Sequence, residues 1–308
     1  MTASSPTTFD ATIVICTKNR KDELRRAVRS ATAQTGCSVE VLVIDDGSTD
    51  GTTEAIRSEF PGVQLQRSEQ SLGYIVQRNR GAAMARAAII ISIDDDAAFS
   101  TPDIVSQTLP EFVDERIGAI AMPFINAPFN ATVQQLAPDA NGIFVIDSYI
   151  GTAHALRKSD FQALGGYREH LVHQCEEEDF CLRLLGQGKF VRLGSAPPIH
   201  HFESPKRDRR RIVAYNARNH LLFGWHNVPM PYYPIYAMAT TFNLLRHGIR
   251  ERTIGPTIQG LWRGWVDTLG HWRERSPVSL RTYRLSRRLK RSAARLMPER
   301  LDRIVDRP

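Results

Sequence analysis

The chain has 308 residues, which is enough for one large domain or for one domain plus an appendage, and its 42% hydrophobic and 24% charged residues are typical of an ordinary globular protein. Its net charge of +7 is unevenly spread, because residues 205–308 hold 22 Lys and Arg against 7 Asp and Glu, whereas residues 1–204 hold 18 against 26. The first ten residues lack a signal-peptide pattern and no run of about 18 apolar residues occurs, so we expect a soluble or membrane-peripheral protein.

Strands and helices alternate through the first 100 residues. The helix expected at 21–34 has its apolar side chains at the i, i+3, i+4, i+7 spacing of one helical face. Short β-branched runs precede and follow it. We therefore expect strands at 11–16, 39–44, 63–66 and 88–93 and helices at 21–34, 53–59 and 75–87, which is the pattern of βαβ units in a mostly parallel sheet.

The later part of the chain is less periodic. We expect strands at 117–122 and 143–149, a short helix that ends at Gly165-Gly166, and a helix at 176–185. From residue 205 onward the sequence is Arg-rich and helical. The four cysteines, Cys16, Cys37, Cys175 and Cys181, lack CxxC spacing and are expected to be reduced thiols of a cytosolic protein.

Carboxylates follow two of the expected strands. Asp94, Asp95 and Asp96 end the apolar strand 88–93, and Asp45 and Asp46 end the strand 39–44. In open α/β sheets ligands bind beyond the carboxyl ends of the strands, and three adjacent acids there favour a divalent cation such as Mg²⁺ or Mn²⁺. The alternatives are a solvated acidic turn for the triplet and an Asx turn for the pair.

A second acidic cluster opens the helix expected at 176–185. Glu176, Glu177, Glu178 and Asp179 repel one another within one helical turn, which would raise the pKa of one of them toward that of a general base. The alternative is that these acids cap the helix N-terminus, which we favour for Glu178 and Asp179, and that Arg183 is an ion-pair partner of Asp179.

Seven short motifs carry a family resemblance between Val14 and about Ser204, two thirds of the chain. Singly most are weak signals, but they occur in one order: Ile15-Cys16-Thr17-Lys18-Asn19-Arg20, Val43-Ile44-Asp45-Asp46-Gly47-Ser48-Thr49-Asp50-Gly51-Thr52, Arg78-Asn79-Arg80-Gly81, Asp94-Asp95-Asp96, Gly165-Gly166-Tyr167, Glu176-Glu177-Glu178-Asp179-Phe180 and His200-His201. In these motifs the chain resembles the family-2-type, nucleotide-sugar-dependent glycosyltransferases. The resemblance implies the GT-A fold, a Rossmann-like α/β architecture with a mixed, mostly parallel sheet and flanking helices.

The resemblance also implies roles on the donor side. Asp94 would face the sugar or ribose, Asp96 would hold Mn²⁺ or Mg²⁺ through the diphosphate of the donor, and Asp95 would lie close behind. The nucleobase of the donor would be bound by Asp46, with Thr17 and Arg20 lining the same pocket. Arg80 would lie near the phosphate or the nucleobase, unless it is an exposed helical residue. The family often has a histidine at the position of His200-His201, where it serves as an additional metal ligand. Neighbouring side chains on an extended segment point to opposite sides, and we favour His201 over His200.

On the acceptor side the resemblance implies a carboxylate base. The family commonly has Glu-Asp-x-Asp-Leu where this chain has Glu-Glu-Glu-Asp-Phe, so Glu177 falls on the base position and Glu176 precedes it. The change from Asp to Glu leaves Glu178 and Asp179 as alternatives. A single base opposite the leaving group suits inversion at the anomeric carbon.

The resemblance divides the chain into a catalytic domain at 1–204, whose half up to about residue 100 binds the nucleotide-sugar, and a basic helical extension at 205–308. Three prolines break the aromatic stretch 219–238, which could lie in a membrane interface or pack on the catalytic domain. A basic helix is expected over 281–295, with Leu285, Leu289 and Leu296 between its arginines, and it either faces anionic lipid or is a solvated face.

Three functions compete. The first is an inverting, metal-dependent glycosyltransferase of cell-envelope or polysaccharide synthesis with a glycan or lipid-linked acceptor, located in the cytoplasm or at the inner face of the plasma membrane. The second is a non-catalytic nucleotide-binding scaffold, which the intact carboxylates disfavour. The third is a nucleic-acid-binding protein, against which stands the lack of any recognisable nucleic-acid motif, so no specific nucleic-acid partner is expected.

Overall fold

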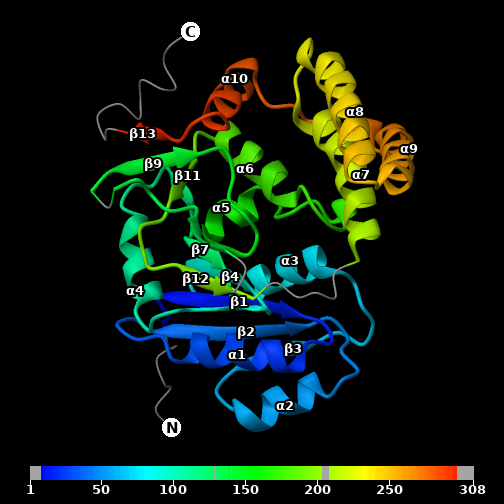
Figure 1. Ribbon diagram of the computed structural model, residues 1–308. Helices are drawn as coiled ribbons and strands as arrows, with labels where there is room; N and C mark the ends of the chain where they lie inside the picture. Colours follow the sequence, from blue (N-terminus) through cyan, green and yellow to red (C-terminus); the bar gives the residue numbers. More distant parts are fainter. Residues whose placement is uncertain (1–7, 128–129, 140, 203–207, 297–308) are drawn as a thin grey trace.

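The computed structural model describes residues 8–127, 130–139, 141–202 and 208–296 (Figure 1). Its centre is a nine-stranded sheet in the order β13-β9-β11-β6-β10-β4-β1-β2-β3. The first four strands are parallel neighbours, as their alternation with helices predicted: β1 (Ala11–Thr17), β2 (Val39–Asp45), β3 (Gln64–Arg67) and β4 (Ile89–Asp94). Consecutive side chains of β1 enter opposite cores, with Ile13 and Ile15 on one face and Val14 on the other.

Helices cover both faces of this sheet. On the face of Ile13, α1 (Lys21–Thr32) and α2 (Thr52–Glu59) bury Leu24 and Ile56 against the strands. On the other face lie α3 (Tyr74–Met84), α5 (Lys158–Ala163) and α6 (Glu176–Gly186). The strands are apolar on both sides because both sides are covered. The predicted α/β architecture is confirmed.

The second half of the sheet is mixed. The strand β10 (Ala153–Arg157) lies antiparallel between β4 and β6 (Ile117–Ala121), and β11 (Phe190–Leu193) pairs with β6 and β9 (Ile143–Ile146). Neither β10 nor β11 was expected. The sequence of β10 is rich in alanine, which has little preference for strands, and its extended form is fixed by the two neighbouring strands.

A small second sheet, in the order β5-β12-β7-β8, crosses the end of β4. It contains β5 (Ala97–Ala98), β7 (Phe124–Asn126), β8 (Asn130–Gln134) and β12 (Ile199–His201). The short helices α4 (Ile104–Thr108) and η1 (Leu109–Glu111) follow β5 in the chain, and η2 (Glu169–Leu171) lies against α3 and α7. Because β12 pairs with β5, it brings residues near position 200 next to the acidic triplet.

The C-terminal part forms a helical layer at the opposite end of the molecule from α1 and α2 (Figure 1). Its helices are α7 (Arg209–Asn227), α8 (Tyr232–Arg250), α9 (Ile254–Gly270), η3 (Trp272–Glu274) and α10 (Leu280–Leu289). No helix among the described residues combines the length and the apolarity that a bilayer span requires. The boundary expected at 204/205 lies outside the described residues, next to the start of α7.

One expectation about this part needs correction. The basic helix expected over 281–295 ends at Leu289, and β13 (Ala294–Leu296) then pairs antiparallel with β9, so the extension adds an edge strand to the main sheet. Pairing with β9 outweighs the local helical preference.

The aromatic stretch 219–238 has two faces. Trp225, Tyr233 and Tyr236 gather around Tyr283 of α10, whereas Ile235 and Met238 are exposed.

Candidate active site

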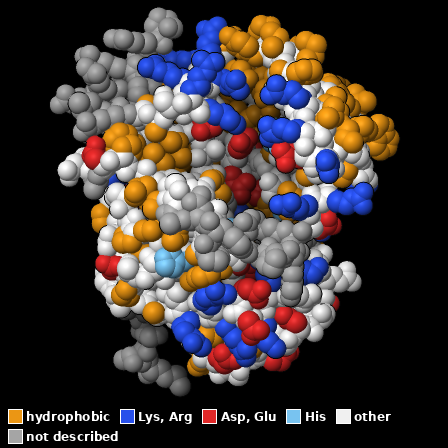
Figure 2. Space-filling model, viewed as in Figure 1, with side chains coloured by type: hydrophobic (Ala, Val, Ile, Leu, Met, Phe, Trp, Pro, Cys, Tyr) orange, Lys and Arg blue, Asp and Glu red, His pale blue; other side chains and the backbone are white. Residues whose placement is uncertain are grey.

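A cleft of about 770 Å³ lies beyond the carboxyl ends of β1, β2 and β4. Its other walls come from α3, the loop 148–152, the first turn of α6 and one side of α7. Figure 2 shows acidic side chains in the hollow between the sheet and the C-terminal helices. Of the residues predicted to form the site, the lining includes Thr17, Arg20, Asp46, Asp94, Asp95, Asp96 and Glu177.

The acidic triplet is held by residues from β1 and the loop after it. The Thr17 hydroxyl donates a hydrogen bond to Asp95 Oδ2 at 2.8 Å. Arg20 Nη1 donates to Asp95 Oδ1 at 2.9 Å and to Asp96 Oδ2 at 2.8 Å. Burial raises the pKa of Asp95 to about 7, although the Arg20 charge opposes this rise. The solvated acidic turn is therefore excluded, since Asp95 is 7% and Asp96 2% exposed.

Asp94, Asp96 and His201 form a possible cation site. Each offers one ligand atom, and these atoms all lie within 4.8 Å of one another. His201 Nδ1 is 2.8 Å from Asn126 Oδ1, and a carbonyl oxygen requires Nδ1 to carry the proton. Nε2 of the same ring lies 3.3 Å from Asp96 Oδ1. Carboxylate oxygens together with an imidazole nitrogen form a set of ligands that fits Mn²⁺ or Mg²⁺.

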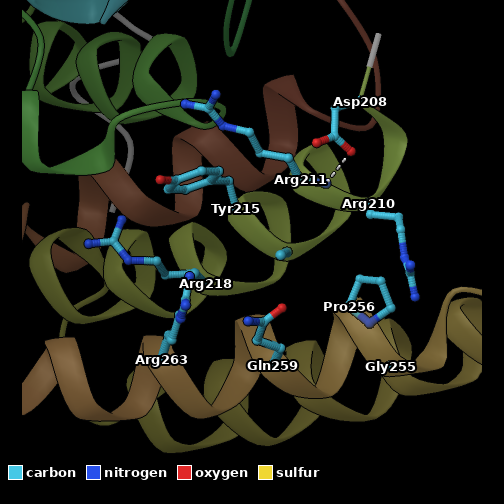
Figure 3. A pocket seen from close by; sticks show the side chains of 10 residues that line it. Asp208, Arg210, Arg211, Tyr215, Arg218, Gly255, Pro256, Gln259 and Arg263 are labelled. Atoms are coloured by element: carbon cyan, nitrogen blue, oxygen red, sulfur yellow. Dashed lines mark hydrogen bonds between the residues drawn. The ribbon is translucent and has the colours of Figure 1, made fainter. Parts of the chain in front are cut away.

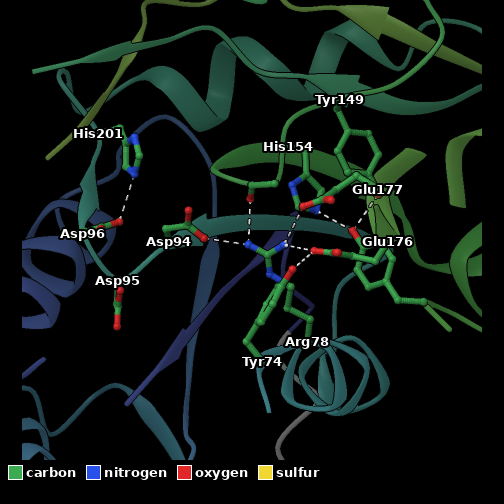
Figure 4. Close-up of polar contacts among 12 residues, drawn as sticks. Tyr74, Arg78, Asp94, Asp95, Asp96, Tyr149, His154, Glu176, Glu177 and His201 are labelled. Atoms are coloured by element: carbon green, nitrogen blue, oxygen red, sulfur yellow. Dashed lines mark hydrogen bonds and ion pairs between the residues drawn. The ribbon is translucent and has the colours of Figure 1, made fainter. Parts of the chain in front are cut away.

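Arg78 of α3 connects the two halves of the cleft, and Figure 4 shows it between the acidic triplet and α6. Its Nη2 donates to Asp94 Oδ1 at 2.7 Å and to the Gly151 carbonyl at 2.9 Å. Its Nη1 lies 3.4 Å from Glu177 Oε1. The side chain is 7% exposed, so its charge acts in a low-dielectric setting.

A cation near phosphate or base was expected at Arg80, but the arginine of this segment that lines the cleft is Arg78. Arg80 Nη1 donates to Ser68 Oγ at 2.7 Å, and the residue is not among those that line the cleft. A signal for Arg78 was present, because Ile75, Arg78 and Ala82 follow the helical spacing of the buried face of α3. An arginine on the buried face of a helix needs a buried anionic partner, whereas one on the outer face does not.

The four acids at the start of α6 have different partners. Glu177 lines the cleft, and burial together with the charge of Glu176 raises its pKa well above the ordinary value. Glu176 is fully buried and accepts a hydrogen bond from the Tyr74 hydroxyl. Glu178 pairs with Lys290 of α10 at 3.2 Å.

Asp179 is a structural residue. Arg183 contacts its carboxylate at 2.9 Å, Asn227 of α7 donates to it at 2.7 Å, and Arg168 also binds it. Burial alone would raise the pKa of Asp179, but Arg183 and Arg168 outweigh it and the pKa is lowered. The expected Asp179–Arg183 pair is present. Of the four acids, Glu177 alone combines access to the cleft with a raised pKa.

The two acids after β2 have separate tasks. Asp45 is fully buried and accepts from the Ser48 amide at 2.8 Å and from the Thr53 hydroxyl, so it fixes the turn as an Asx-type interaction. Asp46 lines the cleft and accepts from Ser71 Oγ, Gln77 Nε2 and the amides of Leu72 and Gly73 at 2.5–3.1 Å. Burial works to raise the pKa of Asp46, but these donors outweigh it and the pKa is lowered. Asp46 is therefore a carboxylate that holds the loop 71–73 against the cleft.

A buried hydrogen-bond network lies behind Glu177 and the loop 148–152. The hydroxyls of Tyr149 and Tyr167 are 2.7 Å apart, and Tyr167 is 3.0 Å from His154 Nε2. Asn79 makes two hydrogen bonds of 2.9 Å with the backbone of Tyr167. The motifs at 78–81 and 165–167 thus meet in space, and together they fix the loop that carries Gly151 under Glu177.

Comparison with known proteins agrees with this geometry. The model of Glycosyl transferase family 2 matches residues 12–159. Over 126 residues the chain is 35% identical to the succinoglycan biosynthesis protein ExoU of Rhizobium meliloti, and the aligned segment covers 39% of this chain and 36% of that protein. Over 269 residues it is 24% identical to the N-acetylglucosaminyl-diphospho-decaprenol L-rhamnosyltransferase of Mycobacterium tuberculosis, and here the aligned segment covers 71% of this chain and 87% of that protein.

Among solved structures, the mannosyltransferase PcManGT from Pyrobaculum calidifontis in complex with GDP-Man and Mn²⁺ has the same fold. The TM-score is 0.56 and the sequence identity 16%, over 86% of this chain and 88% of that chain. The chain thus spans about a third of the length of ExoU but most of the length of the mannosyltransferase.

Proposed function

The chain belongs to glycosyl transferase family 2 through residues 12–159 and has the GT-A fold, and we propose that it transfers a hexosyl or deoxyhexosyl group from a nucleoside-diphosphate sugar to an acceptor hydroxyl with inversion. One observation carries the proposal. A single cleft is lined by Asp94 and Asp96, which form a possible cation site with His201, and, across Arg78, by Glu177, a carboxylate of raised pKa.

On the donor side, Asp94, Asp96 and His201 would hold the Mn²⁺ or Mg²⁺ ion. Such an ion would neutralise the charge that develops on the leaving diphosphate. Thr17 and Arg20 keep the triplet in place and line the nucleotide pocket, while Asp46 presents its loop toward the base. The phosphate-side cation that was expected at Arg80 is assigned to Arg78, because Arg78 contacts Asp94 within the cleft.

On the acceptor side, Glu177 is the general base. It takes the proton of the acceptor hydroxyl as the new carbon–oxygen bond forms, and the bond to the diphosphate breaks on the opposite face of the sugar. A base with a raised pKa accepts this proton more readily than an ordinary carboxylate, which is only weakly basic. One carboxylate acting from one side gives a single displacement and thus inversion.

The surface of the C-terminal layer supports a lipid-linked acceptor. Large apolar side chains on α8, α9 and η3 are 44–74% exposed: Ile235, Met238, Phe242, Ile249, Ile258, Trp262, Trp265, Val266, Leu269 and Trp272. Figure 2 shows hydrophobic side chains over this region, interspersed with Lys and Arg. Exposed tryptophan beside arginine suits the interface of an anionic bilayer. We propose that this apolar face docks on the inner face of the plasma membrane during polysaccharide or cell-envelope glycan synthesis, the processes to which the names of the two relatives point.

The test is donor binding followed by turnover. Thermal shift is measured with UDP-, dTDP- and GDP-sugars, with and without Mn²⁺, on the wild type, on Asp96→Asn and on the exposed control Asp22→Asn. A donor at a hundredfold excess over Kd should stabilise the protein by about 2.7 kcal/mol. Metal-dependent stabilisation by one nucleotide class, lost only in Asp96→Asn, is expected. No shift with any donor would overturn the proposal, and binding without transfer or donor hydrolysis would favour the non-catalytic scaffold.

A further inference from the structure

A second cavity, of about 500 Å³, lies between α7 and α9 (Figure 3). Among the described residues, its lining includes four arginines, three from α7 and one from α9, and one acid, Asp208. We call it the arginine cavity and define it by the residues Arg210, Arg211, Tyr215, Arg218, Gln259 and Arg263.

Close packing of the two helices brings these side chains together. A Cβ on Gly260 would lie 2.2 Å from the Ala214 carbonyl oxygen, and one on Gly264 would lie 2.8 Å from the Arg218 carbonyl oxygen. Arg263 stands one residue before Gly264, so the near-contact of the backbones places its side chain beside α7. The glycines thus determine that arginines of two helices share one cavity.

The positive charge in the cavity is only partly compensated. Arg218 is paired with Asp267 and donates to the His170 carbonyl, which makes it a fixed wall. Arg210, Arg211 and Arg263 have no carboxylate within 4.0 Å in the part of the chain that the structure describes. The three side chains are exposed, so water screens their mutual repulsion, and their N–H groups remain available to an anion from solution. Guanidinium groups bind phosphate oxygens in a bidentate manner, so a phosphate or diphosphate is the matching anion.

The arginine cavity adjoins the catalytic cleft. Asp208 and Arg211 line both, and α7 forms a wall of each. On the same helix as Arg263, the side chains of Trp262 and Trp265 belong to the exposed apolar face. An anionic group held in the arginine cavity would therefore have the catalytic cleft on one side and an apolar surface close by.

We propose that the arginine cavity binds the phosphate or diphosphate of a lipid-anchored acceptor and so positions the acceptor sugar toward Glu177. This inference rests on the proposed function. It adds to that function a second binding site, the arginine cavity, and the chemical class of its ligand. The ligand is a phosphate or diphosphate ester, which joins an apolar chain to the acceptor sugar.

The test uses the full chain and three probes. The first is phosphatidylcholine vesicles that contain a long-chain polyprenyl diphosphate. The second is phosphatidylcholine vesicles with enough phosphatidylglycerol to match that charge, and the third is inorganic pyrophosphate in solution. The variant Arg210→Gln/Arg263→Gln removes two cavity charges, and Arg29→Gln/Arg57→Gln removes two exposed charges from α1 and α2 as the matched control.

The expected result is a loss of roughly tenfold or more in affinity for polyprenyl diphosphate vesicles and for pyrophosphate, seen in the cavity variant and not in the control. In the cavity variant, affinity for phosphatidylglycerol vesicles should fall less than affinity for polyprenyl diphosphate vesicles. An unchanged affinity for polyprenyl diphosphate would overturn the inference, as would an equal loss on phosphatidylglycerol vesicles, since the cavity would then bind membrane headgroups. Thermal shift with the nucleotide-sugar, run on the same samples, separates this failure from a failure of the donor site.

Discussion

Gly151 lies so close to Glu177 that a Cβ at position 151 would be 2.0 Å from Glu177 Oε1. The same Cβ would be 2.8 Å from Arg78 Nη1. The absence of a side chain at this position is therefore what lets the carboxylate and the guanidinium meet in the cleft.

Replacing Gly151 by alanine should lower kcat by about tenfold or more, because the methyl group displaces the carboxylate of Glu177, the proposed base, and the guanidinium of Arg78 beside it. The ends of flexible side chains can move, so the free energy of unfolding should fall by about 1 kcal/mol or less. Steady-state kinetics and denaturant unfolding test this. Gly62→Ala, where a Cβ meets nothing within 4 Å, is the control. An unchanged kcat in Gly151→Ala would show that the position of Glu177 does not matter.

The charge of Arg78 lowers the pKa of Glu177, although burial and Glu176 raise it overall. Activity should rise with pH as Glu177 loses its proton. In Arg78→Gln the midpoint of this rise should move to higher pH by about one unit or more, because an attractive charge has been removed. The measurement is kcat against pH on the residual activity. Arg80→Gln, on the outer face of the same helix, should keep the wild-type midpoint, and a shift to lower pH in Arg78→Gln would contradict the assignment.

Asn126 orients His201 through its 2.8 Å contact with Nδ1. Asn126→Ala should weaken Mn²⁺ binding by about 10- to 100-fold, because the ring loses the partner that fixes its tautomer. Titration of Mn²⁺ at saturating donor, followed by thermal shift, measures this affinity. The exposed Asn141→Ala serves as the control. Equal Mn²⁺ affinities in the two variants would remove His201 from the cation site.

Three histidines join the C-terminal layer to η2. His170 Nε2 lies 3.1 Å from His226 Nε2, and the rings of His170 and His271 stack at 4.3 Å with an interplanar angle of 24°. His170, His271 and Glu274 could hold a metal ion by distance, but lone pairs in nearly parallel ring planes do not converge on one ion at about 2 Å. Burial lowers the pKa of His170 and of His226 to about 4 from 6.5, and neighbouring His and Arg charges add to it.

The cluster should make the protein sensitive to acid. Below pH 6.5 these histidines bind protons in the unfolded chain but not in the folded cluster. Their contribution to the free energy of unfolding is therefore fully present above pH 6.5 and is lost as the pH falls toward 4. Each group contributes up to about 1.4 kcal/mol per pH unit in this window. In His226→Gln the free energy of unfolding, measured by denaturant at several pH values, should depend less on pH. The exposed His247→Gln should retain the wild-type slope, and an unchanged slope in His226→Gln would refute the explanation.

The membrane proposal predicts that exposed tryptophans drive vesicle binding. Trp262→Ser/Trp265→Ser should reduce affinity for phosphatidylglycerol-rich vesicles by about tenfold or more, as apolar area is lost from the interface. Sedimentation with vesicles provides the measurement. Leu72→Ser/Val113→Ser removes two exposed apolar side chains elsewhere and should bind like the wild type. Equal binding by both variants would exclude α9 as the docking surface.

The sequence by itself determined the first half of the fold and the identity of the acids. Apolar runs that end in charge predicted β1, β2 and β4, and helical spacing predicted α1 and α3, because both signals are local and repeat within a few residues. The motifs also placed Asp94, Asp96 and Glu177 in one cleft once the strand order was known. Such patterns could be read because each depends on neighbours in the chain.

Tertiary structure decided what depends on distant segments. The pairing of β12 with β5 places His201 beside Asp96, and burial on the sheet side of α3 selects Arg78 over Arg80. The return of β13 to β9 has no periodic signal in the sequence, and the helical spacing of Gly260 and Gly264 does not say which helix they contact. Local periodicity fixes which face of an element is buried, but pairing between remote strands and helices is decided by packing of the whole chain.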